Sequence, residues 1–200
     1  MDTLANMRSA VQSDLTVGDE SALYSPTTID LAINRAYRKA GALFPWPELM
    51  DAQKTNAVSG QDYYDYPTTW RSNSIWRLEI SSERYGEDPD GSPLSYDDFL
   101  NWKEDYSSSN DKKWTSQERR YFVSPTPTAT GTNNLVIWGQ VVTVILDEDS
   151  DVTIFSYHMF EGNEAIILEA VAILKAKGEN ERSSEFKSLE AKQLLAVAWG

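Results

Sequence analysis

Residues 25–47, SPTTIDLAINRAYRKAGALFPWP, carry the clearest structural signal in the sequence. Ser25 can cap the free amides of a helix, and a proline at the first helical position, here Pro26, loses no hydrogen bond. Pro45 and Pro47 then end the helix, because proline has no amide hydrogen and clashes with the preceding turn. Between these limits the apolar residues recur at helical spacing: Ile29, Ile33, Ala36, Tyr37, Ala40 and Phe44. The stretch therefore predicts an amphipathic helix with one buried face.

Helical patterns continue towards both ends of the chain. On the N-terminal side, four apolar residues form one stripe: Leu4, Met7, Val11 and Leu15. On the C-terminal side, Gly162-Asn163 precedes a predicted helix that runs through Lys177, and Gly178 is a natural stop. A final amphipathic helix is marked by Phe186, Leu189, Leu194 and Val197.

The middle of the chain, from Thr55 to about Tyr157, is rich in aromatic and β-branched residues separated by Ser, Asn, Pro and Gly. Ser59-Gly60 predicts a hairpin turn, and Ser95 caps a short helix. Strands are predicted over four segments: 75–85, 120–124, 134–139 and 141–146. The expected fold class is α+β, in which terminal α-helices (residues 1–52 and 160–200) form a small helical bundle and residues 53–159 form an inserted β-rich subdomain.

Composition excludes several classes of function. The 200 residues contain no cysteine, which rules out disulfides, thiolate nucleophiles and Fe–S clusters. The net charge of −13 argues against binding nucleic acid through phosphate contacts, because such proteins need a basic face. No apolar run approaches the roughly 18–20 residues of a membrane span, and the acidic Met1-Asp2-Thr3 start has no apolar region after it. We therefore expect no membrane association and no secretion.

Motifs that could carry chemistry are incomplete. His158 is the only histidine, and no G-x-S-x-G sequence presents a nucleophile beside it. The alternation of Asp147, Asp149 and Asp151 resembles the start of a calcium loop, but Val152 and His158 stand where glycine and glutamate are required. The acidic pairs 97–98 and 104–105 fit a solvated helix and loop, and no phosphate-binding loop occurs. The sequence predicts no catalytic site, no metal site and no cofactor.

Aromatic residues and the apolar C-terminus leave binding functions open. Seven tryptophans and ten tyrosines suit a β-sheet core or a protein interface, and they would also suit a carbohydrate-binding module. The last residues, LLAVAWG at 194–200, are apolar where free termini are usually polar. We expect this end to dock either on the protein's own body or on a partner.

The opening stretch resembles a known family. Residues 25–37, SPTTIDLAINRAY, followed by FPWPEL at 44–49 and EGNEAI at 161–166, are similar to the helical segments of phage head-to-tail adaptor proteins. These include the tail tubular protein A type and related neck or connector proteins. The order of helices, β-rich middle and closing helices fits the same family along essentially the whole chain.

The resemblance implies a structural protein of the virion neck that is assembled in the host cytoplasm. Such adaptors form a homo-oligomeric ring, typically of twelve copies, between the portal protein and a tail protein of the nozzle or tube. The helical part seats against the portal and the β-rich part faces the tail. Genome DNA passes through the channel without specific binding, and an acidic wall would repel its phosphates.

Two residue sets follow from the resemblance. Portal contact is assigned to the C-terminal residues Leu194, Leu195, Val197 and Trp199. Contact between adjacent subunits is assigned to the polar side of the opening helix, namely Asp30, Arg35, Arg38 and Lys39. Alternative readings are another tail-completion or baseplate subunit, a carbohydrate-binding module, or a hydrolase without a recognisable motif.

Overall fold

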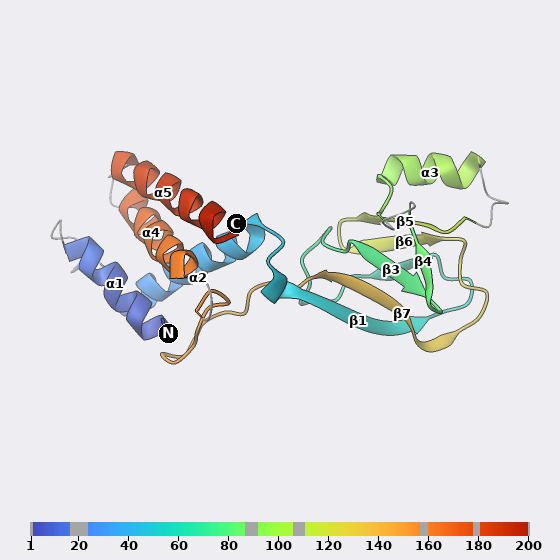
Figure 1. Cartoon of the computed structure of the whole chain (residues 1–200), viewed down its shortest axis with the longest axis horizontal. Helices are drawn as coiled ribbons and strands as arrows, with labels where there is room; N and C mark the ends of the chain where they lie inside the picture. The colour runs from blue at the N-terminus through green and yellow to red at the C-terminus, as the bar shows by residue number, and fades with distance from the viewer. Residues whose placement is uncertain are drawn as a thin grey trace. The chain divides into compact units, whose positions relative to one another are not determined.

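The computed structural model describes residues 2–16, 24–86, 92–105, 111–156, 160–177 and 181–199 (Figure 1). These residues form α-helices and two antiparallel sheets, which confirms the predicted α+β class. The chain divides into two compact units. One comprises Met1–Leu49 and Thr143–Gly200, and the other comprises Met50–Val142. They are called the helical unit and the β unit.

The described residues of the helical unit form four helices and one short 3₁₀ turn (Figure 1). They are α1 (Leu4–Thr16), α2 (Pro26–Leu43), the turn Pro47–Leu49, α4 (Phe160–Lys177) and α5 (Glu181–Trp199). Helix α4 is the centre of this unit, because α1, α2 and α5 all pack against it. Its buried hydrophobic side chains are small or aliphatic: Ala165, Ile166, Ala170, Val171, Ala172 and Leu174. The largely apolar sequence of α4 suits a helix that is buried on several sides.

Helix α2 forms as its sequence predicts. The Ser25 hydroxyl accepts a hydrogen bond from the Thr28 amide at 3.3 Å, which satisfies one of the free amides at the helix start. The helix ends at Leu43, and Phe44 adopts an extended backbone with φ −129° and ψ 159°, as is usual for a residue before proline. The Trp46 indole N–H then donates to the Ala40 carbonyl at 2.8 Å. This bond folds the FPWP turn back onto the helix end.

The described residues of the β unit form two antiparallel sheets and one helix (Figure 1). The first sheet has the order β1-β7-β3-β4, formed by Met50–Ala57, Gly131–Gln140, Arg77–Ile80 and Glu83–Tyr85. The second has the order β2-β6-β5, formed by Tyr63–Asp65, Arg120–Ser124 and Lys113–Gln117. Helix α3 (Tyr96–Asp105) packs against β5, and the Ser95 hydroxyl accepts from the Asp98 amide at 3.2 Å as its N-cap.

The core of the β unit follows the two-residue period of its strands. Alternate residues of the first sheet, such as Leu78 and Ile80, are buried in one cluster with Tyr64, Tyr121 and Val123 of the second sheet. The cluster also holds four further large aromatic side chains of this unit: Tyr66, Trp70, Tyr85 and Trp114. Many of the aromatic residues counted in the sequence thus serve this core.

Two of the predicted strands differ from the structure. The predicted strand 75–85 is a hairpin, because the chain turns at Ser81 and Ser82 with φ of 53° and 65°. The predicted strand 141–146 does not form, although strands 120–124 and 134–139 are present as β6 and part of β7. Strand β7 pairs with β1 as far as the Met50–Gln140 pair, where β1 begins. After Gln140 no residue of β1 remains to pair with the chain, so strand β7 ends there.

Three smaller differences concern turns and boundaries. The turn at Ser59-Gly60 is present, but it connects β1 and β2, which belong to different sheets. Strand β5 (Lys113–Gln117) was not predicted. Helix α4 begins at Phe160, so Gly162 lies inside it, and a Cβ atom there would stand 2.4 Å from the Phe155 ring. Glycine at this position therefore allows the close approach of Phe155.

Residues 143–156 belong to the helical unit, whereas the sequence placed everything up to residue 159 in the β-rich subdomain. Hydrogen bonds to the helices explain this. The Asn34 side chain of α2 accepts from the Leu146 amide and donates to the Leu146 carbonyl, both at 2.8 Å. The Leu4 amide at the start of α1 donates to the Asp151 carbonyl at 2.8 Å. These contacts fix an irregular segment that has no regular secondary structure of its own.

Candidate assembly surfaces

Helix α5 carries apolar residues on two sides. On its buried side, Ala191 and Leu195 are 1% and 6% exposed, and Leu194 is half-buried. On its opposite side, Phe186, Leu189 and Val197 are 69%, 55% and 67% exposed. Packing within the helical unit explains the apolar residues on the buried side. It does not explain the apolar residues on the exposed side.

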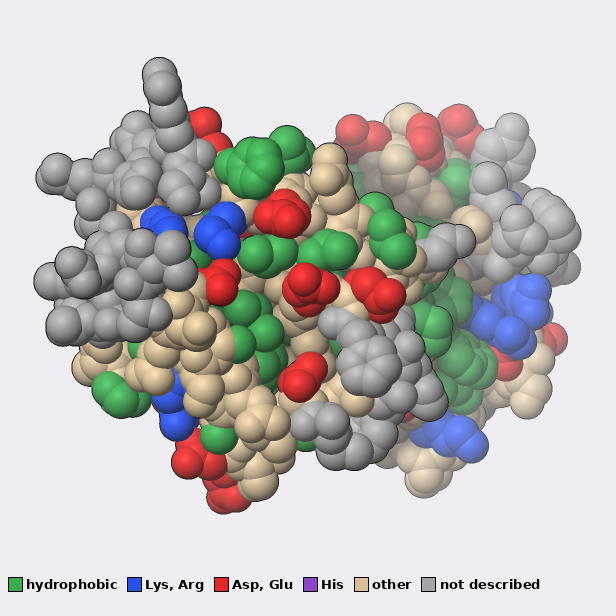
Figure 2. Space-filling view, turned by 60° about the vertical axis from the view of Figure 1, so that its left-hand side comes forward, with side chains coloured by type: hydrophobic (Ala, Val, Ile, Leu, Met, Phe, Trp, Pro, Cys, Tyr) green, Lys and Arg blue, Asp and Glu red, His purple; other side chains and the backbone are tan. Residues whose placement is uncertain are grey.

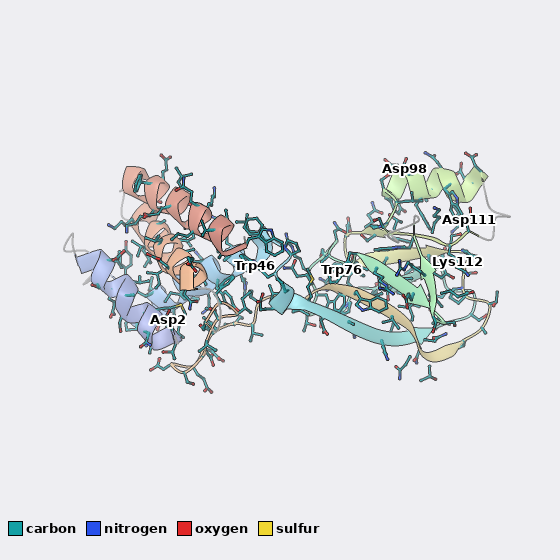
Figure 3. All side chains as sticks on the ribbon, viewed as in Figure 1. Asp2, Trp46, Trp76, Asp98, Asp111 and Lys112 are labelled. Carbon is teal, nitrogen blue, oxygen red and sulfur yellow. The ribbon has the colours of Figure 1, made fainter. Side chains whose placement is uncertain are left out.

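The C-terminal end of α5 packs on an aromatic cluster of the same unit (Figure 3). The Trp199 ring stacks on Phe44 with centroids 5.5 Å apart, and it meets Trp46 edge-on at 5.4 Å. Trp46 in turn contacts Phe155 edge-on at 4.9 Å, and both of these residues are fully buried. The apolar end therefore docks on the protein's own body, while Trp199 remains 41% exposed.

The four residues assigned to portal contact thus have different surroundings. Leu195 is part of the packing of the helical unit, and Leu194 is half-buried beside it. Trp199 uses one face of its indole ring for Phe44. Val197 is the most exposed of the four, so its side chain has the most surface to offer a partner.

The four residues assigned to subunit contact also separate into two groups. Asp30 accepts two hydrogen bonds from Arg8 of α1, at 2.7 and 2.9 Å, and Arg8 also forms an ion pair with Asp149 at 2.9 Å. The hydrogen bond to Asp30 is the main cause that raises the pKa of Arg8. Lys39 pairs with Glu169 on α4. Asp30 and Lys39 are therefore engaged inside the helical unit.

Arg35 and Arg38 are exposed, and neither forms an ion pair within the described parts of the chain. They lie on one side of α2 with two exposed apolar residues, Leu31 and Ala42. These four residues, at positions i, i+4, i+7 and i+11, form what we call the α2 stripe. The sequence prediction found its basic residues but missed Leu31, which is 58% exposed.

The acidic motifs serve local structure. The Asp151 carboxylate accepts from the amides of Asp147 and Glu148 at 2.8 and 2.9 Å, and these bonds lower the pKa of Asp151. The Asp98 carboxylate accepts a hydrogen bond from the Ser95 hydroxyl, the N-cap of α3. In the part of the chain that the structure describes, no group of three or more His, Cys, Asp or Glu side chains is arranged to hold a metal ion. His158 lies outside the described residues.

The helical unit presents a mixed surface of acidic and hydrophobic side chains (Figure 2). On the face turned to the viewer, Asp and Glu side chains lie among hydrophobic ones. Such a surface combines apolar area for packing with charge for choosing a partner. Of the helices described, none is both long and apolar enough to cross a membrane.

The exposed apolar and charged stripes on two helices are the features of a protein that binds other proteins in an assembly. Comparison with protein families is in agreement with this class. Residues 2–195 match the model described as the SU10 adaptor protein, which spans both units. The chain belongs to the SU10 adaptor protein family, and it is a structural adaptor protein of a bacteriophage. No curated protein matches the chain.

Proposed function

We propose that this chain forms a non-catalytic ring in the virion neck, which joins the portal to the tail and surrounds the path of the DNA. The observation that carries the proposal is the family match over residues 2–195, because it covers the helical unit and the β unit together. The helical unit with α5 binds the portal protein. The β unit binds the tail nozzle or tube protein. The ring contains twelve copies, as the resemblance implies.

The net charge of −13 supports a channel that DNA crosses without binding. An acidic wall repels the phosphates of the DNA, whereas binding through counterion release needs a basic wall. The acidic side chains on the helical unit in Figure 2 are available for such a wall. This role needs no sequence-specific contact to the genome.

Among the four C-terminal residues assigned to portal contact, Val197 offers the best test of that contact. Deleting the last residues would also remove Leu195 and Trp199, and so would weaken the packing of the helical unit itself. The Val197 side chain is 67% exposed, so a charge there changes the surface and leaves the packing intact. Val197→Asp should weaken binding to isolated portal rings by about tenfold or more, because it places a charge in an apolar contact.

Binding is measured by sedimentation of purified protein with portal rings, followed by the mass of the complex, which gives the copy number. Leu100→Asp is the matched control, because Leu100 is an exposed apolar residue (42%) on α3 of the β unit. It should bind the portal like the wild type. Failure of the wild-type chain to bind portal rings would overturn the adaptor function. Normal binding by Val197→Asp would overturn only the C-terminal contact.

A further inference from the structure

The helical unit carries a second exposed stripe, which lies on α5. Five exposed residues, spaced at 3, 4, 7 and 11 positions from the first, share one side of this helix: Phe186, Leu189, Glu190, Gln193 and Val197. We call them the α5 stripe. Its first half is apolar and acidic, because Glu190 belongs to it and the exposed Glu185, four residues before Leu189, lies at its edge. The α2 stripe is instead apolar and basic.

We propose that the α2 stripe of one copy binds the first half of the α5 stripe of the next copy. This inference rests on the proposed ring and names the surfaces that close it. Leu31 packs against Phe186 and Leu189, while Arg35 and Arg38 pair with Glu185 and Glu190. The occupant of each stripe is therefore a second copy of this chain.

Unpaired charge supports the match between the two stripes. Neither Glu185 nor Glu190 forms an ion pair within the described ranges, and the same holds for Arg35 and Arg38. Other charged residues close to them are already engaged, as Asp30 is with Arg8, Lys39 with Glu169, and Lys187 with Asp14. Lys192, exposed beside the pocket between α2 and α5, lies off the α5 stripe.

Charge also selects a head-to-tail arrangement over a two-fold one. Two α5 stripes facing each other would bring Glu185 and Glu190 of both copies together, and two α2 stripes would do the same with their arginines. Like charges in contact are unfavourable, whereas α2 against α5 joins opposite charges. A contact between two different surfaces of identical chains is heterologous, and repetition of such a contact can close into a ring.

The two stripes are separate surfaces of the unit. Helices α2 and α5 both pack on α4, so each turns its exposed side away from this shared helix. One copy can therefore engage a neighbour through each stripe at the same time, as every subunit of a closed ring must.

Charge reversal tests the pairing. Arg35→Glu with Arg38→Glu should lower self-association on portal rings by at least about tenfold, and Glu185→Arg with Glu190→Arg should do the same. Combining all four changes in one chain should restore self-association, because opposite charges face each other again. All four residues are exposed, so circular dichroism should show unchanged folding. Self-association is measured by the mass of complexes formed with and without portal rings.

Cross-linking gives a second test, made simple by the absence of cysteine from the chain. The variant Leu31→Cys with Leu189→Cys should form a ladder of disulfide-linked multimers on oxidation, while each single variant should stay unlinked. Efficient dimers from Leu189→Cys alone would show a two-fold contact and overturn the proposal. If the wild type forms rings but neither the combined charge reversal nor the cysteine pair behaves as expected, the stripes are not the interface. If the wild type forms no rings at all, the proposed function itself fails.

Discussion

The indole ring of Trp199 lies parallel to the phenyl ring of Phe44, with their centroids 5.5 Å apart and 3° between their planes. This contact joins the last described residue of the chain to the C-cap residue that follows α2. It closes the aromatic cluster around Trp46, whose ring is fully buried. The C-terminal end of α5 is thereby part of the helical unit and also part of its surface.

Trp199→Ala should destabilise the helical unit by about 1–2 kcal/mol, because it removes a stacked ring from a half-exposed site. Urea denaturation followed by circular dichroism measures the change. Val197→Ala is the control, since Val197 is largely exposed, and it should change stability by less than about 0.5 kcal/mol. Equal stability of the Trp199 variant and the wild type would mean that the stacking contributes nothing.

Asp30→Asn should destabilise the chain by about 1–2 kcal/mol, because it weakens the charge-assisted hydrogen bonds that hold α1 to α2. Arg35→Ala, on the same helix, should be nearly neutral in the isolated protein, since Arg35 is exposed and has no ion pair among the described residues. Thermal denaturation of both variants gives the comparison. A larger loss from Arg35→Ala than from Asp30→Asn would contradict these assignments.

Ser82→Gly should stabilise the β unit by about 1 kcal/mol. Ser82 follows Ser81 in the two-residue turn between β3 and β4, and its φ of 65° is a conformation that glycine adopts without strain. Ser81 is left unchanged, because its hydroxyl accepts a hydrogen bond from the Asn134 side chain at 3.1 Å. The denaturant midpoint should rise for Ser82→Gly, and an unchanged or lower midpoint would refute the turn assignment.

Alkaline pH should weaken the β unit. Burial raises the pKa of Tyr85 to about 12 and also raises the pKa of Tyr121. The stability that these two neutral, buried tyrosines contribute is complete below the ordinary tyrosine pKa of about 10. It is lost as the pH rises through their pKa values in the folded state. At about pH 11, the raised pKa of Tyr85 alone should lower the free energy of unfolding by about 1 kcal/mol.

Urea denaturation at about pH 8 and about pH 11 measures this loss. The Tyr85→Phe variant has no ionisable group at this position, so its stability should fall less between the two pH values than that of the wild type. An equal fall in both proteins would show that Tyr85 does not contribute to the pH dependence.

Parts of the assembly surfaces could be read from the sequence. The polar side of residues 25–43 predicted Arg35 and Arg38 as exposed residues of α2, and the apolar C-terminus predicted a docking end. Neither pattern indicated that Asp30 is held by Arg8, or that Leu195 is buried while Val197 is exposed. Those differences depend on which helices pack together, and helical periodicity does not specify this.

The sequence by itself determined the α+β class, the start and end of α2, and the strand over 120–124, since caps, prolines and alternation act within a few residues. Only the tertiary structure decided that residues 141–146 form no strand, that 75–85 turns back at Ser81-Ser82, and that Phe44 meets Trp199. Such features join positions that are distant in the chain or depend on whether a partner strand is present. Their free energy comes from contacts that exist only once the whole unit has folded.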